Sequence, residues 1–213
     1  MSQGVTRLGE GRGPAAAYLA AEAIGSAAAE QAPGENFPVA LRVLPARYRR
    51  HLQAVYGFAR AVDDMGDEAP PEDRLRLLDE LEADLGRLYR GLGAAAPSPG
   101  GGAPAAPLLP APPGAADQPE RADGEHLPRI GVVRDLAPVV TECGVPQQPF
   151  TDLIRANRQD QVVTRYATAA DLFGYCELSA NPVGRIVLHV FGAFTPERAI
   201  LSDRVCTALQ LAE

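Results

Sequence analysis

Apolar residues along most of this 213-residue chain recur at the three- and four-residue intervals of an α-helix. The clearest case follows Pro70 and Pro71, which suit the opening of a helix. No segment has the clear two-residue alternation of a half-buried strand, so the pattern predicts an all-α fold. The stripe expected to face the core on this helix consists of Leu75, Leu78, Leu81, Leu85 and Leu88.

The same periodicity predicts further helices, whose ends are marked by proline and glycine residues. Pro38 and Pro45 suit first helical turns, so the segment after Glu35 reads as helix, turn, helix. Gly144 precedes Pro146 and predicts the end of a helix. The predicted helices cover about residues 46–65, 129–143, 148–163 and 169–191, the last with Asn181-Pro182 inside it, and a final helix runs from near Pro196 to Glu213.

Composition divides the chain into three parts. Residues 1–34 read as a flexible leader, and residues 35–213 as the N-terminal part of one helical domain. Residues from about 92 to 127 are rich in proline, glycine and alanine, have no hydrophobic period, and predict a disordered surface insertion within that domain. A linker between two domains is less favoured, because neither flank looks complete alone.

Charge and residue usage exclude several classes of function. The net charge of −7 and a pI near 5.0 disfavour binding to nucleic acid or to an anionic membrane. All basic residues are arginines, so a phosphate-binding loop lysine and a Schiff-base lysine are excluded. The three cysteines are widely spaced, which disfavours a disulfide framework or a zinc site and fits a reducing, cytoplasmic setting. No run of 18 apolar residues exists.

The predicted helix over 46–65 ends in a stripe of functional groups. With Tyr56 at zero and about 100° per residue, Arg60 lies at ~40°, Asp63 at about −20° and Asp67 at ~20°. A phenol, a guanidinium and two carboxylates thus share one face, and Asp64 lies beside them.

This stripe suits a diphosphate. Two carboxylates one turn apart can hold Mg²⁺ through oxygen ligands and leave positions for water and phosphate. Arg60 can donate two hydrogen bonds to phosphate oxygens, and Tyr56 can donate one. The alternative is a solvated acidic face at a helix end; it is weakened because a tyrosine and an arginine continue the stripe upstream.

At this stripe the sequence resembles the squalene/phytoene synthase family, whose first aspartate-rich motif lies in a Y-x-x-x-R-x-x-D-D-x-x-D frame. The likeness is nearest to the hydroxysqualene synthase branch of bacterial hopanoid biosynthesis. It covers about residues 34–211 apart from the insertion. The blocks that carry it are ENFPVA from Glu35, the stripe itself, RANRQDQ from Arg155 with Arg165-Tyr166, Tyr175-Cys176, and SANPVGR from Ser179.

The resemblance implies an isoprenoid-synthase helical bundle around a central cavity, incomplete at its C-terminus. It implies Mg²⁺-dependent ionisation of presqualene diphosphate, with water capturing the carbocation to give hydroxysqualene. Asp63 and Asp67 would bind the metal. The implied catalytic residues are Tyr56, Arg60, Asp63, Asp64 and Asp67, and the implied substrate-binding residues are Asn36, Asp160, Gln161, Arg165, Tyr166, Asn181, Val183 and Gln210.

Physical alternatives stand beside some of these assignments. Asp160, Gln161, Arg165 and Tyr166 could equally form a structural hydrogen-bond network. The apolar run from Val183 to Phe191 could line a hydrocarbon cavity or belong to an ordinary core. Pro182 is expected to kink its helix, and Gly184 to permit a close approach.

The sequence departs from the family at its end. The family continues into a second aspartate-rich motif that supplies opposing carboxylates, whereas here Gln210-Leu211-Ala212 is followed by Glu213. The expectation is therefore a fragment, a truncated product, or a chain without turnover, with apolar surface exposed. Alternative functions are head-to-head condensation to presqualene diphosphate or phytoene, and non-catalytic binding of a prenyl diphosphate. The greasy substrate also suggests peripheral contact with the inner face of the membrane.

Overall fold

The structure is a computed structural model that describes residues 44–95 and 127–212. Within these ranges the chain forms eight helices and no strand, as the hydrophobic periodicity predicted. The leader, Asn36 and most of the expected insertion lie outside the described residues. In chain order the helices are α3 (Ala46–Asp67), α4 (Pro71–Ala95), α5 (Gly131–Asp135), α6 (Ala137–Cys143), α7 (Gln147–Asp160), α8 (Ala169–Ser179), α9 (Asn181–Val190) and α10 (Pro196–Gln210).

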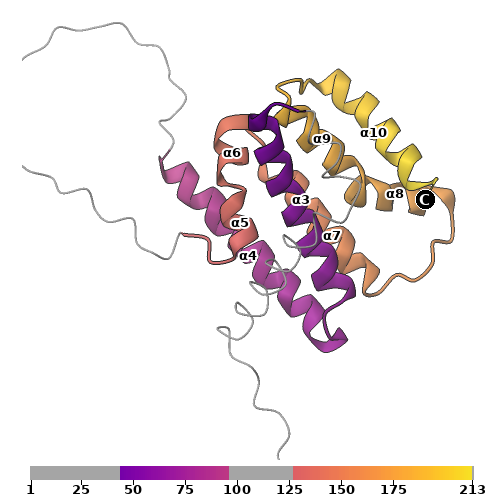
Figure 1. The fold of residues 1–213 in the computed structure, drawn as a ribbon. Coiled ribbons are helices and arrows are strands. Elements are labelled where there is room, and N and C mark those ends of the chain that lie inside the picture. Colours follow the sequence, from indigo (N-terminus) through magenta and orange to yellow (C-terminus); the bar gives the residue numbers. More distant parts are fainter. Residues whose placement is uncertain (1–43, 96–126, 213) are drawn as a thin grey trace, which may run out of the picture.

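The core lies where α3, α4 and α7 pack together, with the short helices α5 and α6 on one side and α9 on another (Figure 1). Phe58 of α3 and Phe150 of α7 meet edge to face at its centre, with ring centroids 5.2 Å apart. Both side chains are fully buried. Aromatic pairs of this geometry add to the free energy gained from burial alone, so they fix how the two helices cross.

The buried face of α4 differs by one residue from the predicted leucine stripe. Leu78, Leu81, Leu85 and Leu88 are buried, but Leu75 is 48% exposed and Leu77 is only 1% exposed. At about 100° per residue, Leu75 lies ~110° from the centre of the buried group, whereas Leu77 lies within about 50° of it. The prediction for Leu75 was wrong because the three-residue interval from Leu78 back to Leu75 turns the side chain away from the buried face of the helix.

Two helices that were expected to be continuous are broken at prolines. The segment 129–143 divides at Leu136 into α5 and α6, and the segment 169–191 divides at Ala180 into α8 and α9. Pro138 and Pro182 stand in the first turns of the later helices. A proline there needs no backbone N–H, whereas inside a longer helix its ring would collide with the preceding turn.

Several helix boundaries also moved. Helix α4 continues to Ala95, into the range expected to start the insertion, and α7 ends at Asp160 rather than near residue 163. Helix α10 ends at Gln210 instead of continuing to Glu213, which lies outside the described residues. The predicted stop at Gly144 is confirmed: its φ of 65° is left-handed, and its N–H donates to the carbonyl of Val140.

A buried carboxylate fixes the start of α5 against α4. Asp84 is 0% exposed and accepts hydrogen bonds from the backbone N–H groups of Arg129 and Ile130, at 2.7–2.9 Å. It also pairs with Arg87 at 2.7 Å. These hydrogen bonds tie the residues just before α5 to the middle of α4.

None of the described helices combines the length and the apolar character that crossing a bilayer requires. Helix α10 lies on the outside of the molecule beside α9, and it contributes one buried apolar residue, Ala199 (Figure 1). The close approach expected at Gly184 is confirmed at this contact. A Cβ on Gly184 would lie 2.3 Å from the Ser202 hydroxyl oxygen and 2.5 Å from the Cys206 sulfur.

Candidate active site

The stripe on α3 is divided between exposed carboxylates and half-buried partners. Asp63 and Asp67 are exposed on the last turns of the helix, while Tyr56 and Arg60 are half-buried further back. The apolar side of the same helix, with Phe58 and Val62, is buried in the core. Burial of that side orients the stripe outward, as expected for an amphipathic helix.

Asp64 differs from its two neighbouring aspartates. It is only 4% exposed, and its Oδ1 lies 2.9 Å from Nε of Arg60. A second acid, Glu68, which directly follows the last residue of α3, lies 3.2 Å from Nη2 of Arg60. The guanidinium is therefore held against its own helix, and Asp64 lies on the inward side rather than in line with Asp63 and Asp67.

Helix α7 brings a third carboxylate to the stripe. Asp160, its last residue, is close enough that its charge and that of Asp67 both raise the pKa of Asp63. The largest cause of the raised Asp63 pKa is loss of hydration, because atoms of both helices surround the carboxyl group. The residue as a whole is still exposed on its outer side. A hydrogen bond from Nδ2 of Asn157 to Oδ1 of Asp63, 3.1 Å long, acts in the opposite direction.

Asp160 itself sits in a similar environment. Loss of hydration raises its pKa, as does the charge of Asp67, while a hydrogen bond from the Tyr175 hydroxyl at 2.7 Å opposes the shift. Burial and the adjacent Asp160 together raise the pKa of that tyrosine. Asp160 of α7 therefore lies near Asp63 and Asp67 of α3, and the repulsion between these like charges contributes to the raised pKa of Asp63 and of Asp160.

These carboxylates offer the kind of ligand atom that a magnesium ion prefers, but they do not provide a full set of ligands. All three offer oxygen, the ligand that Mg²⁺ prefers, and the ion usually takes one or two carboxylates and fills its other positions with water and phosphate. In the described ranges no group of three or more acidic, histidine or cysteine residues could hold a metal by itself. The carboxylates of the described residues are therefore suitable ligands but do not make a complete metal site by themselves.

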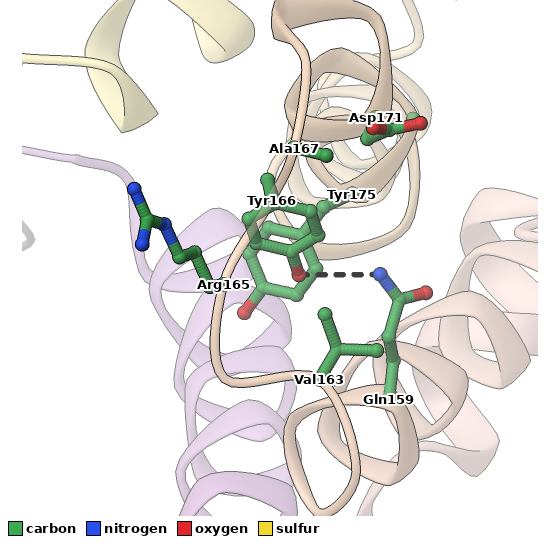
Figure 2. A pocket seen from close by; sticks show the side chains of 8 residues that line it. Gln159, Val163, Arg165, Tyr166, Ala167, Asp171 and Tyr175 are labelled. Carbon is green, nitrogen blue, oxygen red and sulfur yellow. Dashed lines mark hydrogen bonds between the residues drawn. The ribbon is translucent and has the colours of Figure 1, made fainter.

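A cavity of about 510 Å³ opens beside Asp160. The rings of Tyr166 and Tyr175 lie across one another there, with centroids 5.4 Å apart, and Gln159 donates a hydrogen bond to the Tyr166 hydroxyl at 3.2 Å (Figure 2). Arg165 extends away from the two rings (Figure 2). The cavity is lined by Gln159, Val163, Arg165, Tyr166, Ala167, Asp171, Gly174 and Tyr175.

Neither Asp63 nor Asp67 lines this cavity; the Tyr175 hydroxyl bound to Asp160 connects the two places. The structure therefore brings together the stripe and Asp160, and it places Arg165 and Tyr166 in the cavity next to them.

Gln161 is engaged with the backbone. Its Nε2 donates to the carbonyls of Gly66 and Asn157, at 2.9 and 3.0 Å. Asn157 was part of the sequence block that carried the resemblance but was not predicted as a site residue. The only sequence signal for its role was its position one turn before Asp160, on the same side of a helix.

The remaining predicted substrate residues lie on α9 and α10. Asn181 is buried and accepts a hydrogen bond from the Thr207 hydroxyl at 3.0 Å, which joins the two helices. Val183 is 38% exposed, and Gln210 is the half-buried last residue of α10. The apolar run of α9 is mixed, because Ile186 is fully buried whereas Val183 is exposed. The binding roles of Asn181, Val183 and Gln210 stay predictions.

The described helices form a bundle with paired carboxylates at the end of α3 and an acid at the end of α7, an arrangement consistent with an isoprenoid-synthase fold. The family description that matches residues 31–213 is squalene/phytoene synthase. The chain belongs to the squalene/phytoene synthase family.

Individual relatives agree with this assignment. A hydroxysqualene synthase of Rhodopseudomonas palustris is 32% identical over 179 residues, which cover 83% of this chain and 48% of that protein. A presqualene diphosphate synthase of the same organism is 29% identical over 180 residues, covering 84% and 52%. The chain spans about half the length of the curated relatives it matches.

Among solved structures, the squalene synthase HpnC from Alicyclobacillus acidocaldarius superposes with a TM-score of 0.64 at 34% identity. The match covers 92% of this chain and 59% of that one. The predicted fold class is confirmed by this neighbour and by the helices of the described residues.

Proposed function

We propose that this chain carries the first carboxylate site of a hydroxysqualene synthase-like enzyme, which ionises presqualene diphosphate and adds water to the resulting carbocation. The observation that carries the proposal is the pair Asp63 and Asp67 at the end of α3, against which the Asn157–Asp63 hydrogen bond holds the end of α7 with Asp160. The identity to hydroxysqualene synthases, 32% for the Rhodopseudomonas protein, supports this reaction over others in the family.

The chain's own residues have distinct tasks in this proposal. Asp63 and Asp67 would hold Mg²⁺, which supplies positive charge against the charge that builds on the departing diphosphate. Arg60 would donate to phosphate oxygens; in the free chain Asp64 and Glu68 keep its guanidinium on the stripe. Tyr56 would donate a further hydrogen bond, one turn before Arg60.

The cavity beside Asp160 suits the organic part of the substrate. The π faces of Tyr166 and Tyr175 attract cations, so they would favour the carbocation over the neutral hydrocarbon. Arg165 at the rim would interact with the diphosphate end. Peripheral contact with a membrane belongs to the same proposal, because the substrate is a long hydrocarbon; co-sedimentation with liposomes tests it.

Product analysis with Mg²⁺ tests the reaction. The chain is incubated separately with presqualene diphosphate and with farnesyl diphosphate, and the products are extracted and separated. Hydroxysqualene from presqualene diphosphate supports the proposal. Presqualene diphosphate or phytoene formed from a prenyl diphosphate would instead support head-to-head condensation, which the 29% identity to a presqualene diphosphate synthase favours as the second candidate.

A binding measurement separates catalysis from binding alone. Calorimetric titration with presqualene diphosphate is expected to show Mg²⁺-dependent binding that Asp67→Asn weakens by at least about tenfold, as loss of a charged ligand would. Asp135→Asn, an exposed aspartate on α5, is the matched control and should leave binding unchanged. Binding without any product would identify a non-catalytic prenyl-diphosphate binder, and Mg²⁺-independent binding would contradict the proposed site.

A further inference from the structure

The carboxylates of the candidate site lie at the ends of two helices. Asp63 and Asp67 are on the last turns of α3, and Asp160 is the last residue of α7. The final carbonyls of a helix have no partner within it, and helix ends tend to fray. Without further contacts, the spacing between the two sets of carboxylates would be poorly fixed.

Arg74 of α4 stabilises the end of α3. Its Nη2 donates to the carbonyl of Asp67 at 2.6 Å, and its Nε donates to the carbonyl of Ala69 at 2.8 Å. The third nitrogen, Nη1, lies 3.4 Å from Oε1 of Gln161. One guanidinium thus satisfies two carbonyls at the C-terminus of α3 and reaches the residue that follows Asp160.

Gln161 and Asn157 continue the network to the carboxylate itself. The Gln161 amide nitrogen donates to the carbonyl of Gly66 on α3 and to that of Asn157 on α7. The Asn157 amide nitrogen then donates to Oδ1 of Asp63. The Asn157 side chain is nearly buried, with 9% of the residue exposed, so solvent competes little for this bond.

Gly66 is the position that makes the contact possible. A Cβ at Gly66 would lie 2.3 Å from Oδ1 of Asn157, a distance that real Cβ atoms do not reach. Its backbone φ is not positive, so the glycine is required for close approach and not for a special turn. By contrast, a Cβ at Gly57 on the same helix would meet nothing within 4 Å.

We infer that Asn157 and Gln161 are positioning residues that hold the end of α7 against the end of α3, so that Asp160 stays beside Asp63 and Asp67 when a divalent cation binds with a diphosphate, and that Gly66 is present to admit Asn157. This inference rests on the proposed function. It reassigns Gln161, predicted from the sequence as a substrate contact, to a role that acts through the backbone of α3 and the side chain of Asn157.

Manganese uptake tests the inference without any assay of turnover. Mn²⁺ prefers oxygen ligands as Mg²⁺ does, and its free form gives an electron paramagnetic resonance signal that falls on binding. The full chain is titrated with Mn²⁺ in the presence of inorganic pyrophosphate, and binding is the fall in signal beyond that of the same titration without protein, because pyrophosphate alone also complexes Mn²⁺. Asn157→Leu keeps the side-chain size and removes the donor; we expect it to weaken Mn²⁺ binding about 10–100-fold, the effect typical of residues that orient metal ligands.

Two matched controls make the test specific. Gln148→Leu removes an amide–carboxylate hydrogen bond to Asp152, 2.8 Å long, at the other end of α7, and should leave Mn²⁺ affinity unchanged. Gly66→Ala leaves residue 157 unchanged but places a Cβ against its side chain, and should therefore reproduce most of the Asn157→Leu effect. Gly57→Ala should have no effect on Mn²⁺ binding. Thermal melting followed by circular dichroism establishes that each variant is folded at the temperature of the titration.

The outcomes separate the inference from the proposed function. If the unaltered chain takes up no Mn²⁺ with pyrophosphate, the proposed function fails, and the inference fails with it. If the unaltered chain binds Mn²⁺ but folded Asn157→Leu and Gly66→Ala bind it equally well, the inference alone is overturned. If Gln148→Leu weakens binding as much as Asn157→Leu, the effect is a general one of α7 and the positioning role is also rejected.

Discussion

The bundle of α3, α4 and α7 and the pair α9–α10 are held together by different physical means. In the bundle, the inward faces are fully buried, as Phe58, Leu81 and Ile154 show. In the pair, α10 has one buried residue, Ala199, and polar side chains link it to α9 in addition to the close packing at Gly184. Arg185 donates two hydrogen bonds to Asp203, at 3.0 and 2.7 Å, and Thr207 donates to Asn181.

The apolar residues of the two regions differ in the same way. Helices α3 and α4 keep their large apolar residues almost entirely on one face, while α10 carries several on the side that no described residue covers. A helix with apolar residues all round is typical of burial on more than one side. The exposed large apolar residues of α10 and of the turn after it are Ile200, Leu201, Val205, Leu209 and Leu211. The expectation of exposed apolar surface is therefore met on α10.

The contrast teaches that the candidate site depends on the well-packed region. The carboxylates of α3 and α7 lie at the ends of two bundle helices; α4 supplies Arg74, and Tyr175 of α8 donates to Asp160. Helices α9 and α10 contribute none of the three carboxylates. Stability of the site and stability of α10 should therefore be separable by experiment.

The largest expected difference comes from one substitution made in each region. Leu81→Ala in the bundle should lower the free energy of unfolding by about 2–5 kcal/mol, because it leaves a cavity in a fully buried position. Leu209→Ala, at a residue that is 61% exposed, should change it by less than about 0.5 kcal/mol. Urea denaturation measures both. Equal losses would mean that α10 is packed as firmly as the bundle.

A smaller effect is expected at the contact between α9 and α10. Gly184→Ala would drive a methyl group into Ser202 and Cys206, and should cost about 1–3 kcal/mol. Amide hydrogen exchange should become faster in α10 than in the bundle of α3, α4 and α7, since local opening is easiest where local packing is weakened. Gly93→Ala on α4 is the control: a Cβ there meets nothing within 4 Å, and the change should stabilise by up to about 1 kcal/mol. Unchanged exchange in α10 of Gly184→Ala would contradict the close contact.

The smallest effect concerns the stripe itself and depends on pH. The pKa of Asp63 is raised in the folded chain, so the folded state favours the protonated acid, and stability from this group falls as pH rises through the raised value. Asp63→Asn should therefore stabilise the chain at neutral pH by less than about 1 kcal/mol, since the group is exposed. The gain should vanish in acid, below the usual aspartate range, where both chains are neutral at this position. Melting curves at the two pH values measure it; a gain that persists in acid would contradict the electrostatic cause.

Much of the fold could be predicted from the sequence because its signals are local. The interval of apolar residues gave α3, the proline pair gave the start of α4, and Gly144 gave the end of α6. The breaks before α6 and α9 also had a local signal in Pro138 and Pro182, which the prediction placed inside longer helices. The direction of the buried face of α4 also has a local signal, because most leucines of this helix lie on the side that includes Leu77 and not Leu75.

The candidate site was predictable only along one helix. Spacing placed Tyr56, Arg60, Asp63 and Asp67 on one side of α3, because the helical repeat fixes angles between neighbours. The same arithmetic put Asp64 beside the stripe; the structure turned it inward to pair with Arg60. A rotation of a few tens of degrees decides that outcome, and it is set by what packs behind the helix.

The sequence by itself determined the helices and the order of chemical groups along α3, since both arise from interactions within a few residues. The tertiary structure decided that Asp160 lies opposite the stripe and that Asn157 reaches Asp63 through the space left by Gly66. It also decided that several apolar residues of α10 are left uncovered by the rest of the described chain. These contacts join residues 90 or more positions apart or depend on neighbours beyond the helix, and their geometry follows from how whole helices pack, which no local pattern encodes.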